Sequence, residues 1–178
     1  MKGSRVAKRY ARALLGLSED HKQLETWGAE LERLAHIADA PEIALRLASP
    51  EVSHEARIDA MAKIAERLEL SYPLRSLAVV MARHGRIANL TAVSESYQDQ
   101  LDMLLGRARA TLTFAREPDL QDTETVVRGL EAVVRKTVIA TVKVDQSLLG
   151  GVVAELEGKI YDGSLATRLS EAQRRMMG

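Results

Sequence analysis

Two consecutive glycines, Gly150 and Gly151, are the first residues to examine for chemistry, because a glycine-rich turn can hold a phosphate group. Such a site places the turn between a strand and the N-terminus of a helix, with a lysine and a serine or threonine, or a ribose-binding acid, nearby. Neither GxGxxG nor GxxxxGK[ST] occurs in the sequence, and the residues after the glycines have the pattern of a strand. The pair therefore predicts a bulge or a close backbone approach that a Cβ would obstruct.

Residues suited to acid–base or metal chemistry are present but scattered. The four histidines, His21, His36, His54 and His84, fall in separate segments, and no HExxH or similar metal-binding spacing occurs. Each carboxylate lies within four residues of a base or on a face predicted to be solvated, so no acid–base pair stands out. The chain has no cysteine, which excludes disulfides, thiolate metal sites and cysteine nucleophiles. We expect no catalytic site, no metal site and no cofactor.

A basic face is predicted on the first helical segment, where Arg5, Lys8, Arg9 and Arg12 follow helical spacing. This face could bind an acidic partner or lipid headgroups, or it could simply be solvated. Organellar transit peptides and membrane-surface helices also begin with amphipathic, arginine-bearing segments. An apolar stripe that starts at Val6 continues into the following segments, which favours the structural first helix of a mature or bacterial chain.

The composition is that of an ordinary soluble globular protein. Hydrophobic residues make up 46% and charged residues 28% of the 178 residues, and the formal net charge is zero. Without a domain-wide basic field, and with only 3% aromatic residues, nucleic acid is not expected as the main partner. The uncharged runs are far shorter than the roughly 20 residues that span a bilayer. The N-terminus also lacks the apolar core of a secretory signal.

Residues 4–105 have a helical period almost throughout, and capping signals divide them into six segments. Ser18 is predicted to cap the second segment and Ser53 the fourth, while prolines bound a short third segment. Gly85 supplies the left-handed residue that ends the fifth. Because the connections are short, neighbouring helices should run antiparallel, and residues 1–105 are expected to form a six-helix bundle.

The pattern changes at Arg107 from a helical period to strict alternation, which predicts a strand over 107–114. A helix through 126–134 and a second strand over 137–144 follow. Strand, helix and strand in so short a span form a crossover unit that makes the two strands parallel. With a later hairpin and a final helix, residues 106–178 should form a small α/β domain, and the fold class is α+β.

An ordered set of short features closes the chain. These are an aspartate, an apolar-Gly-Gly-apolar core, a hairpin at Glu157-Gly158, an apolar-Asp-Gly-Ser turn whose serine can cap a helix, and a basic-Leu pair in that helix. The set resembles the C-terminal signature of the delta subunit family of the F-type ATP synthase, whose mitochondrial form is the oligomycin-sensitivity-conferring protein. The signature residues, taken as structural, are Asp145, Gly150, Gly151, Asp162, Gly163 and Ser164.

The N-terminal half also resembles this family, through Arg9-Tyr10-Ala11-Arg12-Ala13-Leu14 and through Gly85-Arg86. The resemblance implies that residues 1–105 bind the catalytic headpiece and residues 106–178 bind the peripheral stalk. It also implies a groove between the first and fifth helices that receives an amphipathic helix of the α subunits by its apolar face. The residues mapped to this partner-binding groove are Val6, Tyr10, Ala13, Ser76, Leu77 and Val80, with Trp27 beside it.

Two of these assignments are open. Trp27 reads from the sequence alone as a core residue, whereas the family places it at the groove rim. Ser76 stands where the family often has a larger polar residue such as asparagine, so the contact at this position is expected to differ from the family's.

The function implied by the resemblance is mechanical. The chain would be a non-catalytic stator subunit that links the N-terminal helices of the α subunits to the C-terminal ends of the b subunits, so that proton flow is coupled to ATP synthesis. We then expect it at the cytoplasmic face of a bacterial plasma membrane, peripheral through the complex and not as a homo-oligomer. Two alternatives remain from the residues: a helical regulatory or nucleic-acid-binding module using the basic first helix, and an enzyme using Gly150-Gly151 for a phosphorylated ligand.

Overall fold

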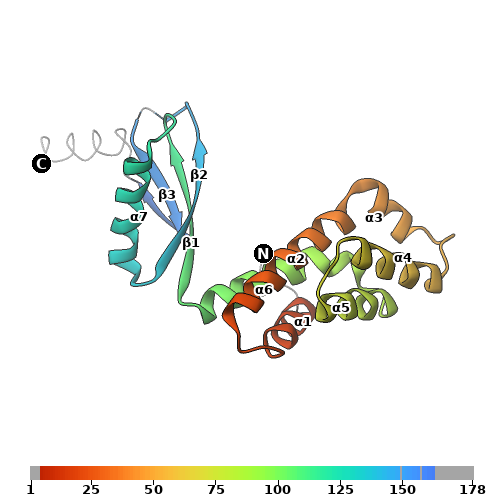
Figure 1. Ribbon diagram of the computed structural model, residues 1–178. Helices are drawn as coiled ribbons and strands as arrows, with labels where there is room; N and C mark the ends of the chain where they lie inside the picture. Colours follow the sequence, from red (N-terminus) through yellow and green to blue (C-terminus); the bar gives the residue numbers. More distant parts are fainter. Residues whose placement is uncertain (1–4, 149, 157, 163–178) are drawn as a thin grey trace, which may run out of the picture. The chain divides into compact units, whose positions relative to one another are not determined.

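The computed structural model describes residues 5–148, 150–156 and 158–162. The chain divides into two compact units, Met1–Leu101 and Asp102–Gly178. The described residues contain seven α-helices and one mixed four-stranded sheet, so the fold class is α+β, as the sequence predicts (Figure 1). The signature residues Gly163 and Ser164, and the closing helix expected from Ser164 onward, lie outside the described residues.

Helices alone build the described part of the first unit. The helices, with one short 3₁₀ turn labelled η1, are α1 Arg5–Leu15, α2 His21–Asp39, α3 Pro41–Ala48, α4 His54–Arg67, α5 Tyr72–Arg83, η1 Ile87–Asn89 and α6 Leu90–Leu104. The last turn of α6 continues past Leu101, where the first unit ends.

Capping residues set the helix ends, with one correction to the sequence-based prediction. Asp20, not Ser18, caps α2: its carboxylate accepts the backbone N–H of Lys22 at 2.9 Å, while the Ser18 hydroxyl accepts the N–H of Asp20 at 3.1 Å. Both side chains satisfy backbone donors, but only that of Asp20 lies next to the first turn. Ser53 caps α4 as predicted, and Gly85 has the predicted left-handed conformation, with φ +63°.

The core of the first unit is built on α2, whose buried stripe packs with α5 and α6. The Tyr97 side chain of α6 is fully buried, and its hydroxyl donates to the backbone carbonyl of Leu24 at 2.8 Å. Next to it, a Cβ added at Gly28 would lie 3.3 Å from the Tyr97 ring and 2.9 Å from the Gln98 amide. The two helices therefore approach closely at a position where glycine leaves room.

The second unit is a sheet with a helix on one face. Its elements are β1 Arg107–Phe114, α7 Leu120–Val134, β2 Thr137–Val144, β3 Val152–Leu156 and β4 Lys159–Asp162. The strand order is β2-β1-β3-β4, with β1 and β2 parallel and both other pairs antiparallel. The predicted crossover and hairpin are thus confirmed.

Helix α7 lies along one face of the sheet (Figure 1). The alternation of β1 gives a buried face of Ala108, Ala110, Leu112 and Phe114, which forms one core cluster with Leu130 of α7. The similar alternation of β2 does not produce the same burial. Val138 is the buried residue of this strand, and β2 lies at the edge of the sheet, where it has a neighbouring strand on one side only. Alternation therefore predicts which face a residue occupies, and the position in the sheet decides whether that face is covered.

Candidate partner-binding surface

Helix α1 divides into three stripes of different character. Its inner stripe, Ala7, Ala11 and Leu14, is buried in the core and fixes the helix in place. A second stripe holds three of the predicted groove residues, of which Val6 and Tyr10 are half-buried and Ala13 is exposed. The third stripe is the basic face. The second stripe is the part of α1 that is anchored yet open to a partner.

Tyr10 connects α1 to the end of α5. Arg86, in the turn after α5, donates from Nη1 to the Tyr10 hydroxyl at 3.1 Å, and its guanidinium carbon lies 5.9 Å from the ring centre. The backbone N–H of Arg86 donates to the Met81 carbonyl of α5 at 2.8 Å, across the left-handed Gly85. This arrangement holds the predicted groove face of α1 beside the C-terminal end of α5.

On α5, the three predicted groove residues differ in exposure. Val80 is 37% exposed and Ser76 is half-buried, so both have surface that a partner can contact. Leu77 is 7% exposed and belongs mainly to the core. Trp27 is 4% exposed and also lies in the core. A partner would therefore change the surroundings of its ring by shifting α5 or α1, and not by covering the ring directly.

Glu30 fixes the other end of α5 and was not singled out from the sequence. This residue is 7% exposed, and its carboxylate accepts two hydrogen bonds from Ser71, the N-cap residue of α5: one from the backbone N–H at 2.7 Å and one from the hydroxyl at 2.8 Å. A carboxylate at a helix N-terminus is favoured by the helix dipole and by the unpaired N–H groups there. Glu30 and Arg86 thus secure α5 at both ends.

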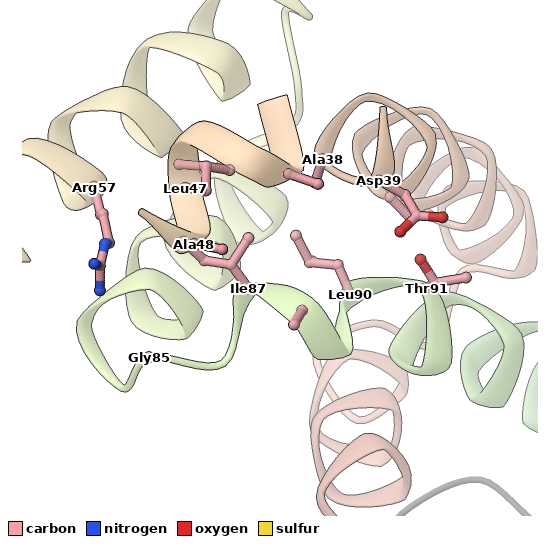
Figure 2. A pocket seen from close by; sticks show the side chains of 12 residues that line it. Ala38, Asp39, Leu47, Ala48, Arg57, Gly85, Ile87, Leu90 and Thr91 are labelled. Carbon is pink, nitrogen blue, oxygen red and sulfur yellow. The ribbon is translucent and has the colours of Figure 1, made fainter. Parts of the chain in front are cut away.

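A pocket of about 330 Å³ lies elsewhere in the first unit, under α3 (Figure 2). Its wall is mostly alanine, leucine and isoleucine from α2, α3, η1 and α6, with Arg57 and Asp39 at opposite ends. Arg57 donates from Nη2 to the Ser49 carbonyl at 2.7 Å, and its buried Nε has no hydrogen-bond partner in the described part of the chain. The lining of this pocket is mainly apolar, and its described residues include no nucleophile that is hydrogen-bonded to a base.

In the second unit, the family signature shapes the loop between β2 and β3. The Asp145 carboxylate accepts the backbone N–H of Ser147 at 2.9 Å, and hydrogen bonds from the side chain and backbone of Ser147 lower the pKa of Asp145. Gly150 and Gly151 have φ values of +137° and +83°, a region that favours glycine. The Gly151 carbonyl accepts the N–H of Ala115 at 3.3 Å.

This loop leads into strand β3 instead of a helix, so it lacks the helix N-terminus on which phosphate loops depend. Both conformations suit glycine, and the predicted bulge or close backbone approach stays a prediction. Asp162 ends β4 and pairs with Val153.

Across residues 5–148, 150–156 and 158–162, no group of three or more histidine, aspartate or glutamate residues is placed to hold a metal ion. No helix in those ranges has the length and apolar character needed to cross a membrane.

Comparisons with known proteins agree over nearly the whole chain. The family model of the "ATP synthase delta (OSCP) subunit" matches residues 6–176. The ATP synthase subunit delta of Citrifermentans bemidjiense is 33% identical over 174 residues, covering 97% of each chain. That of Anaeromyxobacter dehalogenans is 34% identical over 170 residues, covering 95% of each.

A solved structure shares the fold. A chain in the cryo-EM structure of the Toxoplasma gondii mitochondrial ATP synthase hexamer matches with a TM-score of 0.65 at 20% identity, covering 98% of this chain and 99% of that one. The chain belongs to the ATP synthase delta (OSCP) subunit family, and its role is that of a non-catalytic stator subunit of the ATP synthase, linking parts of the complex through the peripheral stalk.

Proposed function

We propose that this chain links two specific partners through its two units. The first unit, with its six helices packed as a bundle, binds the N-terminal helix of an α subunit in a groove between α1 and α5. The second unit binds the C-terminal ends of the b subunits. Because the headpiece would otherwise turn with the rotor, this connection resists torque and lets proton flow drive ATP synthesis.

The observation that carries the proposal is the contact between Tyr10 and Arg86, which brings the open stripe of α1 to the end of α5. Small or accessible side chains line both sides: Ala13 and Val6 on α1, and Ser76 and Val80 on α5. An amphipathic helix can approach such a surface closely and bury its apolar face there. A binding mode of this kind needs shape and apolar area, with no reactive group.

Exposed apolar side chains support the role of the second unit. Ile160 on β4 is 71% exposed, and Val142 and Val144 on the edge strand β2 are 42% and 49% exposed. By register, Val142 and Val144 lie on the α7 face of the sheet and Ile160 on the opposite face, so the exposed apolar side chains mark two separate places at which a partner can contact the unit. We assign this partner to the b subunits, which would hold the chain peripherally at the cytoplasmic face of the plasma membrane.

Two synthetic peptides test the assignment on the isotope-labelled full chain. A peptide of the α-subunit N-terminus from the same organism should shift the backbone NMR resonances of α1 and α5. A peptide of the C-terminal end of the b polypeptide should shift those of β1–β4 and α7. If the α peptide bound only the second unit, or if it failed to bind at micromolar concentration, the groove assignment would be wrong.

A further inference from the structure

The third stripe of α1 carries four exposed cations in a row. Arg5, Lys8, Arg9 and Arg12 follow the i, i+3, i+4, i+7 spacing of one helix face, and together with Ala13 they surround an open hollow of about 450 Å³. Within the described residues, none of the four forms an ion pair with a carboxylate. In a chain whose formal charge is zero, this is a local excess of positive charge that no carboxylate of the described residues neutralises by direct pairing.

Helix geometry places this basic stripe beside the proposed groove. At about 100° per residue, the groove stripe of Val6, Tyr10 and Ala13 lies roughly 100° around α1 from the buried stripe, and the basic stripe lies roughly another 120° further on. Ala13 belongs to the groove stripe and also lines the basic hollow. A helix that lies in the groove with its apolar face inward therefore has one flank on the side of the basic stripe, with Arg9 and Arg5 nearest to it and Arg12 and Lys8 further around α1.

We infer that the helix received by this groove carries carboxylates along the flank that faces Arg5, Lys8, Arg9 and Arg12. The inference rests on the proposed function and specifies the chemistry of the partner. The apolar side of the occupant holds it in the groove, while its acidic flank sets its direction and its position along α1. Complementary charge also attracts the partner before contact and raises the association rate.

Two other anionic partners fit the surface less well. A helix that binds a lipid surface inserts its apolar face between headgroups, but the apolar face of α1 is buried in the core at Ala7, Ala11 and Leu14. Nucleic acid is bound by wider basic surfaces, commonly with aromatic residues for stacking, and this stripe is one helix wide on a chain with 3% aromatic residues.

The test compares two variants of the full chain that lose the same charge. The variant Arg5→Gln, Lys8→Gln, Arg12→Gln removes three cations of the stripe and keeps Arg9, whose guanidinium carbon lies 5.6 Å from the centre of the Tyr10 ring. The matched control Lys22→Gln, Arg33→Gln, Lys63→Gln removes three exposed cations from α2 and α4. Circular dichroism establishes that both variants remain folded.

Calorimetry measures the affinity of each protein for the α-subunit N-terminal peptide, at about 50 and about 500 mM salt, because added salt screens exposed charges. With three exposed pairs lost, the stripe variant should bind about tenfold more weakly at low salt and lose most of its salt dependence, while the control binds as the parent chain does. A peptide whose Asp and Glu are replaced by Asn and Gln should reproduce the weak binding to the parent chain.

Four outcomes decide the inference. Weakened, salt-insensitive binding in the stripe variant alone supports it. Equal affinity and equal salt dependence for stripe variant, control and parent would overturn it and leave the groove proposal standing. Absence of peptide binding to every protein would remove the groove proposal and the inference with it. Binding of phosphatidylserine vesicles or duplex DNA that depends on the stripe, with peptide binding unaffected, would assign the surface to that anion instead.

Discussion

Replacing Glu30 by alanine should destabilise the first unit strongly, because this buried carboxylate holds the N-terminus of α5. Its two oxygens accept the backbone N–H and the hydroxyl of Ser71 at 2.7 and 2.8 Å. Hydrogen bonds to a charged group contribute about 1.5–3 kcal/mol each. Since Ser71 is half-buried, water can replace part of the loss. We therefore expect the free energy of unfolding to fall by about 2–4 kcal/mol.

Two companion variants make this expectation quantitative. In Glu30→Gln the amide can retain both contacts as neutral hydrogen bonds, so the loss should be about 1 kcal/mol. Glu32→Ala removes an exposed carboxylate from the same helix and should change the free energy of unfolding by less than about 0.5 kcal/mol.

Urea unfolding followed by tryptophan fluorescence measures these differences in the relevant unit. Trp27 is the only tryptophan in the chain and lies buried in α2, so its emission reports the unfolding of the first unit. The midpoint should shift while the slope stays constant. A Glu30→Ala loss no larger than that of Glu32→Ala would refute the idea that Glu30 anchors α5.

Four further predictions concern single residues of the two units. Gly129 faces open space on α7, so Gly129→Ala should raise the free energy of unfolding of the second unit by about 0.5–1 kcal/mol. Gly28 packs closely against Tyr97 and Gln98, so Gly28→Leu should lower the free energy of unfolding of the first unit by about 2 kcal/mol or more through overpacking. Burial raises the pKa of Tyr97 from 10.0 to about 12. The stability that the neutral tyrosine contributes to the fold is therefore complete below pH 10 and is lost as the pH rises to about 12. Tyr97→Phe should lower the free energy of unfolding by about 1–2 kcal/mol at neutral pH, because the hydrogen bond of the hydroxyl is lost. Measured by urea unfolding, the variant should lose less stability than the parent chain as the pH rises to about 12. An equal loss in both proteins would show that other groups cause the decline in stability. Gly151→Ala places a side chain at φ +83° and should cost about 1–2 kcal/mol, measured as faster amide exchange in β3; unchanged exchange would show that the loop adapts.

The sequence predicted the helices and the parallel pairing of the first two strands because those features depend on local periodicity and on chain connectivity. Period 3.6 and capping residues located the helices, and the short crossover made β1 and β2 parallel. The cap of α2 was predicted wrongly because Ser18 and Asp20 are both good capping residues, and the choice depends on how the turn between them folds. The edge position of β2, which leaves its second half exposed, follows from the sheet order and not from the strand's own pattern.

The contacts that position the candidate groove were less accessible to sequence reasoning. Tyr10 and Arg86 are 76 residues apart, and Glu30 and Ser71 are 41 apart, so both pairs depend on tertiary packing. One local signal was present for Glu30: it lies three residues after Trp27, on the apolar stripe of α2, where an acid requires a partner.

The central claim is that one copy of this chain holds the headpiece and the stalk at the same time. Capture of the purified catalytic headpiece on immobilised C-terminal segments of the b polypeptide tests it most directly, with the full chain added or left out. The headpiece should be retained only when the chain is present. Ala13→Asp with Val80→Asp, two substitutions at exposed groove positions, should abolish retention of the headpiece while the chain itself still binds the b segments. Retention that does not require the chain, or that persists with the double variant, would contradict the account.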